Sequence, residues 1–446
     1  MLAVLANRTY RHLFLAQVIA LVGTGLATIA LGLLAYDIAG KEAGAVLGTA
    51  LAIKMIAYIG VAPVVGAFAD RLPRRAFLVS MDVVRAAVAL LLPFVDQIWQ
   101  IYVLIFVLQS ASAAFTPTFQ ATIPEVLPKE ADYTRALSLS RLAYDMESLT
   151  SPILASALLT VISFHWLFSG TAIGFIASAL MVVTIVLPQA KPSGKPSEGI
   201  YKKTTRGARI YLKTPRLRGL LAITLASAAA SAMVIVNTVV IVRDTLGLGQ
   251  REVALTLAAY GGGSMLAALT LPRILERVGD RIIMLIAAAT LTAGLGVLAA
   301  LTAVIGRAPQ YWSVILAGWI VLGMAYSASV TPSGRLLKRS ANSEDRPALF
   351  AAQFALSHGC WLIAYPLAGQ IGARFGEAAA FGGLAILAAV GTAIAVTIWP
   401  VADPETLPHR HDELASDHPH MKNEHGGNAS REHRFVIDDL HPRWPV

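Results

Sequence analysis

Charge, cysteine and the motifs of soluble enzymes are scarce in this sequence of 446 residues. Charged residues make up 14% of the chain, whereas they make up about a quarter of a typical soluble protein. The single cysteine excludes disulfide bonds within the chain and zinc sites built from several cysteines. No P-loop, nucleophile elbow or HExxH motif occurs, so the sequence shows no sign of ATP hydrolysis or of common hydrolase chemistry. These absences argue against a soluble enzyme.

Apolar residues are abundant instead. They make up 56% of the chain, and the mean hydropathy is +0.63. A helix needs about 20 mostly apolar residues to cross a bilayer, and the chain contains twelve such stretches. We therefore expect an all-α membrane protein with twelve transmembrane helices. The expected helices span residues 12–36, 44–68, 76–95, 98–121, 138–162, 165–187, 218–242, 253–275, 282–305, 311–332, 349–373 and 378–400.

Lysine and arginine are distributed unevenly between the two sides of these helices. With both termini in the cytoplasm, the inner segments up to residue 347 hold 23 of these residues and the outer loops hold five. Such an excess is typical of short cytoplasmic loops. The net charge of +9 then reflects topology and attraction to anionic lipids of the inner leaflet. We expect no nucleic-acid partner.

Two related charged motifs lie half a chain apart, each after an apolar run. The first reads Gly66-Ala-Phe-Ala-Asp70-Arg71-Leu-Pro-Arg74-Arg75, and a degraded copy, Pro272-Arg-Ile-Leu-Glu276-Arg277-Val-Gly-Asp280-Arg281, follows 206 residues later. The repeat indicates a duplicated helical bundle with a charged loop in each half. The residues expected to control its conformation are Gly66, Asp70, Arg71, Arg74, Arg75, Glu276, Arg277, Asp280 and Arg281.

The pattern G-x-x-x-D-R-x-x-R-R strongly resembles the signature of major facilitator superfamily transporters, and the resemblance covers essentially the whole chain. It implies two six-helix pseudo-repeats, secondary transport and no enzymatic activity. The expected parts are an N-terminal half over 1–187, a flexible basic cytoplasmic linker over 188–217, a C-terminal half over 218–400 and a cytoplasmic tail over 401–446. Superfamily antiporters often carry a glycine-rich stretch in helix five, whereas this chain has Ser151-Pro152 there.

Three ionisable residues within apolar helices are candidates for proton coupling, because charges inside a membrane are costly and usually functional. Lys54 either reaches for the outer interface or pairs with a carboxylate in a cavity, and it suits coupling better than binding a metal cation. Asp145 is four residues from Arg141 on one helix face, so these two should pair. Glu147 points elsewhere, either as a hydrated carboxylate or as the proton carrier.

Gln353, His358 and Cys360 are candidates for the transport path in the eleventh expected helix. His358 and Cys360 are two residues apart, so they point about 200° away from each other on a regular helix. They can bind one ion together only if the helix is broken. Each also has a structural explanation, namely a hydrogen-bonded histidine and a small buried cysteine.

The last 46 residues lack an apolar run, have a charge of −4 and hold seven of the ten histidines. Such tracts are typical of metal binding, although a disordered polar tail can also be rich in histidine. The candidate metal ligands are His409, His411, His418, His420, His425, His433 and His441. Apolar and aromatic residues return in Phe435–Pro445, which we expect to dock on another surface.

This ending, the histidine-rich tail and the stretch Phe354–Gly369 resemble the nickel-resistance (Nre-type) branch of the superfamily. The resemblance implies export of Ni²⁺, or of Co²⁺, in exchange for protons across a bacterial cytoplasmic membrane, with no bound cofactor. We expect a monomer. The alternative substrate is a small organic compound such as a drug or siderophore, and a less favoured alternative is a metal sensor that does not transport.

Overall fold

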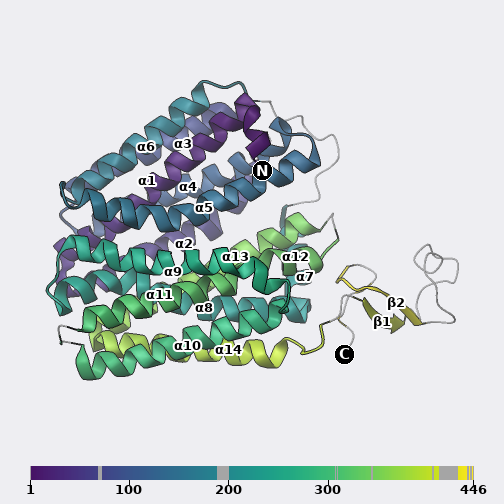
Figure 1. Cartoon of the computed structure of the whole chain (residues 1–446). Helices are drawn as coiled ribbons and strands as arrows, with labels where there is room; N and C mark the ends of the chain where they lie inside the picture. The colour runs from purple at the N-terminus through teal and green to yellow at the C-terminus, as the bar shows by residue number, and fades with distance from the viewer. Residues whose placement is uncertain are drawn as a thin grey trace.

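The structure, a computed structural model, is a bundle of long helices followed by a small β-hairpin (Figure 1). It describes residues 2–68, 73–187, 200–306, 308, 310–342, 345–403, 406–410, 430–438, 441 and 444. Twelve long helices fall into two groups of six in the described chain. The first group is α1 (Arg8–Ala39), α2 (Ala43–Phe68), α3 (Arg74–Leu91), α4 (Ile98–Val126), α5 (Glu130–Leu158) and α6 (His165–Val183). The second is α8 (Pro215–Val240), α9 (Gln250–Leu275), α10 (Asp280–Ile305), α11 (Tyr311–Val330), α13 (Arg346–Phe375) and α14 (Glu377–Ile398).

These helices agree with the twelve expected apolar runs. Ten described segments are long and apolar enough to cross a membrane, and the first of them contains both α1 and α2. Helix α5 is not among them because charged residues occupy its first half, and it begins at Glu130 rather than near residue 138. Large apolar side chains such as Phe94 and Val304 are more than four-fifths exposed. This outer surface suits contact with lipid, and the chain is a multi-pass membrane protein.

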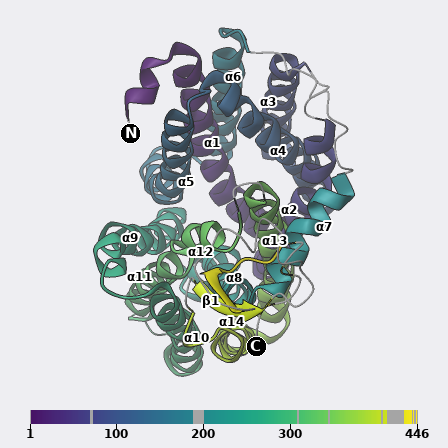
Figure 2. The same ribbon diagram turned by 90° about the vertical axis from the view of Figure 1, so that its right-hand side faces the viewer.

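The two groups form two halves that lie side by side (Figures 1 and 2). Helix α2 packs along α13, and α5 packs along α9, so two helix pairs join the halves. Both termini, the hairpin and two short helices, α7 (Ile200–Lys213) and α12 (Ser333–Arg339), lie at one end of the bundle, which we call the linker end. We call the opposite end the far end. The helices of the N-terminal half slope away from the C-terminal half toward the linker end (Figure 1).

Small residues bring the halves together near the far end. Gly44 and Gly48 are four residues apart on α2, and a Cβ atom on Gly48 would lie 2.5 Å from the carbonyl oxygen of Tyr365 on α13. A Cβ atom on Gly369 of α13 would lie 2.1 Å from the carbonyl oxygen of Gly44. Such spacing of small residues lets two membrane helices approach at the level of their backbones. The side-chain amide of Asn237, on α8, donates to the carbonyl oxygen of Ala368 over 3.1 Å and completes this contact.

The second half of the expected linker is a helix rather than a flexible segment. Helix α7 buries Ile210 and Tyr211 against the C-terminal half, while Arg209 and Lys213 are exposed. Arg206 forms an ion pair of 2.6 Å with Asp345, just before α13. Burial raises the pKa of the Tyr211 hydroxyl group, which therefore stays protonated and donates to Gln353 over 2.5 Å. One apolar face and these polar contacts hold α7 to the bundle.

The C-terminal segment docks on the chain's own C-terminal half. Strands β1 (Thr406–Arg410) and β2 (Ser430–Arg434) form an antiparallel pair. After β2, the side chains of Phe435 and Ile437 are buried in the same core as α8. The ring of Trp444 lies 5.1 Å from Phe435 and 4.9 Å from the guanidinium carbon of Arg216. The expected docking of this segment is confirmed.

Candidate functional site

Lys54 lies in α2 beside a pocket of about 20 Å³, which has room for roughly one water molecule. The polar groups around it are uncharged and come from α1 and α4: Thr24, Thr28, Gln109 and Ser112. The hydroxyl groups of Thr24 and Thr28 donate to carbonyl oxygens of their own helix over 2.9 and 3.0 Å. Their lone pairs therefore remain available to accept from an ammonium group. Lys54 thus lines a small pocket whose other polar groups are uncharged acceptors, inside the N-terminal half.

Glu147 faces the same region from α5. Its carboxylate interacts electrostatically with Lys54, although the two residues are on different helices. The carboxylate and the hydroxyl group of Ser151 lie against the backbone of Gly25 on α1, in the space that a Cβ atom there would need. Ser151 is 1% exposed, and its hydroxyl oxygen has no hydrogen-bond partner. Helix α5 thus presents one acid and one unsatisfied hydroxyl group toward α1.

His358 extends this group of ionisable residues to the C-terminal half. Its ring is stacked on Tyr58 of α2, with the ring centres 5.3 Å apart and the planes at 7°. Its Nδ1 atom lies 2.6 Å from the carbonyl oxygen of Phe354. Lys54 lies 5.9 Å above the Tyr58 ring and interacts electrostatically with His358. One stack of side chains therefore joins the two halves near the middle of α2 and α13.

A second group of aromatic rings lies further along α13 and on α11 and α9 of the C-terminal half. Trp361 lies 5.0 Å from Tyr365 and 6.4 Å from Tyr326 of α11. Tyr326 in turn lies 5.9 Å from Tyr260 of α9. The hydroxyl groups of Tyr260 and Ser231 share a hydrogen bond of 2.5 Å. We call the rings of Tyr58, Phe354, His358, Trp361, Tyr365, Tyr326 and Tyr260 the aromatic array.

The other candidates on α13 point away from His358. Gln353 accepts the hydrogen bond from Tyr211 described above. Cys360 is buried, and its sulfur lies 3.9 Å from the carbonyl oxygen of Leu221 on α8. Helix α13 is continuous through this region. His358 and Cys360 thus face different neighbours, as the helical periodicity predicts.

The first charged motif is described only in part. Gly66 lies in α2, and Asp70 and Arg71 lie outside the described residues. The expected pair of Arg141 and Asp145 on α5 also cannot be assessed, because the side chains of both residues lie outside the described part of the chain. Arg74 forms an ion pair with Glu125, and Arg75 donates to the carbonyl oxygen of Val183.

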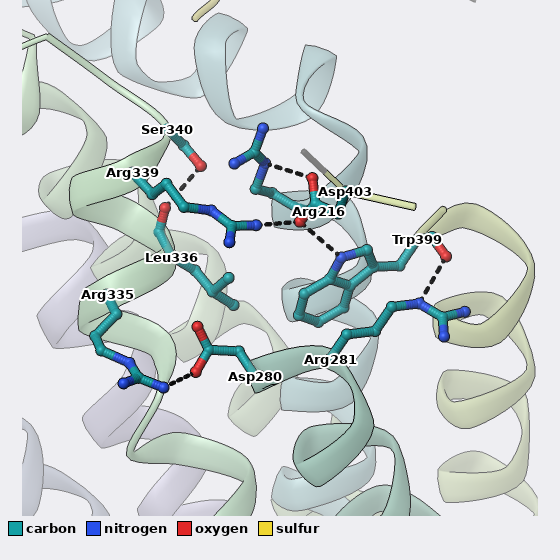
Figure 3. Close-up of polar contacts among 9 residues, drawn as sticks. All are labelled: Arg216, Asp280, Arg281, Arg335, Leu336, Arg339, Ser340, Trp399 and Asp403. Carbon is teal, nitrogen blue, oxygen red and sulfur yellow. Dashed lines mark hydrogen bonds and ion pairs between the residues drawn. The ribbon is translucent and has the colours of Figure 1, made fainter. Parts of the chain in front are cut away.

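The second motif joins helices of the C-terminal half at the linker end (Figure 3). Asp280 forms an ion pair with Arg335 of α12, and Arg281 donates to the carbonyl oxygen of Trp399 over 3.1 Å. Glu276 and Arg277 are exposed. The motif thus ties the start of α10 to α12 and to the end of α14.

Asp403 is the centre of a neighbouring cluster that the sequence analysis missed. It forms an ion pair of 3.2 Å with Arg216 and a second with Arg339, and it accepts from the indole nitrogen of Trp399 over 3.2 Å (Figure 3). Its partners are up to 187 residues away from Asp403 along the chain, so no local sequence pattern predicts the cluster. An acid soon after the last apolar run was the available signal.

Within α3, Asp82 and Arg85 form a buried ion pair. Asp82 also accepts from Ser178 over 2.8 Å, and the Arg85 guanidinium carbon lies 4.2 Å from the Phe115 ring. These contacts tie α3 to α4 and α6. The pair is structural.

The tail histidines are described unequally. His441 is buried, and its Nδ1 atom lies 2.8 Å from Asp438. His409 and His433 lie on the two strands, and nothing is described of their side chains. His411, His418, His420 and His425 lie outside the described residues. In the part of the chain that the structure describes, no group of three potential ligands is placed to hold a metal ion.

Comparison with known proteins decides the family. The sequence profile of the Major Facilitator Superfamily matches residues 13–239 and 220–430, which together span most of the chain. The chain belongs to the major facilitator superfamily. Its family is one of transporters rather than enzymes. The structure of a POT family transporter in complex with 5-aminolevulinic acid shares the superfamily fold with a TM-score of 0.70 at 12% identity, covering 88% of this chain and 96% of that one.

Superfamily relatives of similar sequence are bacterial. The chain is 24% identical to the uncharacterized transporter YvqJ of Bacillus subtilis over 79% of its own length and 83% of the relative. It is 31% identical to the uncharacterized transporter YfiS of the same species over 28% of its own length, and 22% identical to macrolide efflux protein A of Enterococcus faecalis over 32%. These two matches span only 30% and 47% of the relatives.

Proposed function

We propose that this chain exports a small organic compound across a bacterial cytoplasmic membrane in exchange for protons. The supporting observation is the aromatic array, whose Tyr58 ring lies beside Lys54 and stacks on His358 where the two halves meet, while Glu147 interacts electrostatically with the same lysine. Ligand sites are mostly apolar and aromatic, with a few polar groups that orient the ligand. Ionisable residues at this depth in a membrane are typically functional. The relation to macrolide efflux protein A agrees with an organic substrate.

The described contacts between the halves favour a conformation that is closed at the far end. They include the packing of Gly48 on Tyr365 and the contact of Arg243 with the Tyr36 ring, 5.4 Å apart. With both termini in the cytoplasm, this is the state that receives a cytoplasmic substrate. We also propose that the basic helix α7 lies near anionic lipid and that the protein acts as a monomer.

A growth assay tests this proposal. An efflux-deficient bacterium with and without the protein is exposed to a panel of lipophilic drugs and metal salts. The Asp70→Asn variant, which we expect to reach the membrane but not to transport, is the control. We expect a higher tolerance of at least one organic compound with the unaltered protein, and loss of this tolerance with the control. Tolerance raised for metal salts alone would contradict organic export.

Export of Ni²⁺ or another divalent metal is the second candidate, and the seven histidines of the tail favour it. Neutral imidazole binds such ions, and a tethered tract raises their concentration near the entrance. Removing residues 405–434 while keeping Phe435–Pro445 should then raise the half-saturating Ni²⁺ concentration for uptake into inverted vesicles. The maximal rate should stay unchanged. Identical curves for both forms would remove the support that the tail gives to this candidate.

A further inference from the structure

We propose that the exported compound carries one positive charge, that it binds to Glu147 and Ser151, and that Lys54 releases the exchanged proton. This inference rests on the proposed export of an organic compound and specifies how that compound is recognised. In this proposal Glu147 binds the substrate and Lys54 transfers the proton.

The arrangement of Lys54 and Glu147 is the first observation. Their charges interact, yet the described residues show neither a hydrogen bond nor an ion pair between them. The carboxylate lies instead against Gly25, and Lys54 lines a pocket together with the hydroxyl groups of Thr24, Thr28 and Ser112. The two charged groups thus lie in different surroundings, and Lys54 does not form an ion pair with the Glu147 carboxylate.

The hydroxyl group of Ser151 is the second observation. It lies beside the Glu147 carboxylate at Gly25, is buried, and has no hydrogen-bond partner. A buried polar group without a partner is uncommon and costly. A carboxylate next to an unsatisfied hydroxyl oxygen places two electron-rich oxygen atoms, one of them charged, where a cationic group can lie. Aromatic rings such as Tyr58 and His358 lie nearby for the apolar part of the same molecule.

Charge balance connects binding to proton release. In low dielectric surroundings, a second positive charge near one carboxylate is strongly unfavourable. Lysine can become a neutral amine, whereas arginine cannot. When the cation binds the carboxylate, the N–H bond of the Lys54 ammonium breaks, the amine keeps the electron pair, and the proton leaves to water through the pocket. One positive charge enters the site and one leaves it, so the exchange is electroneutral.

The other groups that face Lys54 are consistent with its role as the group that releases the proton. His358 on α13 is the further titratable base, and Tyr58 lies one turn along α2. The residues that α1 and α4 contribute to the pocket carry no charge. An anionic substrate at Lys54 would require a protonated Glu147, so the anion and the proton would travel together. That coupling would give uptake with the usual proton gradient rather than export.

The test measures proton release by the purified, intact protein in a weakly buffered detergent solution. The probe is tetraphenylphosphonium, a lipophilic cation without an exchangeable proton, and triphenylphosphine oxide is its uncharged counterpart. We expect the unaltered protein to bind the cation at least about tenfold more tightly than the uncharged probe and to release about one proton per bound cation. Lys54→Gln should bind the cation and release none, and Glu147→Gln should lose binding at least about tenfold.

A second substitution at the same position distinguishes loss of the proton donor from misfolding of the protein. Lys54→Arg keeps the positive charge but cannot give up a proton, so it should bind the cation more weakly and release none. The matched controls are Lys41→Gln and Glu42→Gln, at exposed neighbouring positions, and they should behave as the unaltered protein.

Proton release that persists in Lys54→Gln or Lys54→Arg would overturn the inference. Equal binding and transport of the uncharged probe would also overturn it, while organic export as such would stand. If the unaltered protein binds neither organic probe but binds Ni²⁺, the inference and the proposed function both fail.

Discussion

Gly25 controls the position of both polar groups on α5. The carboxylate of Glu147 and the hydroxyl group of Ser151 occupy the space where any other residue would carry its Cβ atom. Helical periodicity separates Glu147 from Asp145 in sequence, but it cannot show that Glu147 reaches Gly25 and Lys54. Those residues are more than 90 positions away along the chain, and only tertiary packing brings them together.

The Gly25→Ala substitution should therefore displace Glu147 and Ser151 and lower transport about tenfold or more, because binding sites tolerate only small displacements. The protein should still reach the membrane. Gly60→Ala is the matched control, since a Cβ atom at Gly60 meets nothing within 4 Å. Uptake into inverted vesicles at equal protein amounts measures the effect. Unchanged uptake by Gly25→Ala would show that this contact is irrelevant to transport.

At the scale of the helices, apolar runs predict the membrane segments well because each needs about 20 residues to cross the bilayer. The prediction fails where charge interrupts the pattern, as in the first half of α5, which begins at Glu130. Helix α7 and the hairpin were also missed. Helix α7 is short and polar outside its buried face, and β2 pairs with β1 across 19 residues.

The packing of α2 on α13 should control closure of the far end. A Gly48→Val substitution overfills this contact, which typically costs about 1–3 kcal/mol, and should shift the protein toward a far-end-open state by roughly fivefold or more. The single cysteine allows a direct measurement in a Cys360→Ser background, with Val239→Cys as the reporter. Val239 contacts Gly32 and is 3% exposed. Labelling by an impermeant maleimide should be faster in Gly48→Val.

Gly262→Val serves as the control for this experiment, because nothing lies within 4 Å of its Cβ position. Equal labelling rates for Gly48→Val and the unaltered glycine would mean that this contact does not close the far end.

The docked C-terminal segment should stabilise the linker end. Phe435 is 3% exposed and packs on Trp444, which contacts Arg216. Replacing a buried phenylalanine by alanine costs up to about 3–5 kcal/mol, so Phe435→Ala should lower the melting temperature in detergent by several degrees. Val401→Ala, at a position that is 86% exposed, is the control. Equal melting temperatures for both variants would show that the docked segment adds no stability.

At the scale of the whole molecule, the charged motif and its repeat predict two related halves, and the family match agrees with that prediction. The substrate could not be read from sequence in the same way. The tail histidines are conspicuous but mostly lie outside the described residues, whereas the aromatic array is assembled from α2, α9, α11 and α13. A sequence pattern shows residues that are close together along the chain, but it does not show residues that only the fold brings together.

The central claim is export of an organic cation in electroneutral exchange for a proton. Its most direct test is the accumulation of tetraphenylphosphonium in inverted vesicles at imposed pH gradients, with the membrane potential clamped by valinomycin and potassium. One-for-one exchange predicts that each pH unit, with the vesicle interior acidic, supports up to about tenfold accumulation. Nigericin, which removes the pH gradient, should abolish that accumulation. Because this cation also crosses lipid unaided, the accumulation is measured as the difference from vesicles without the protein. A protein-dependent accumulation that persists with nigericin, or that follows the membrane potential at a constant pH gradient, would contradict the account.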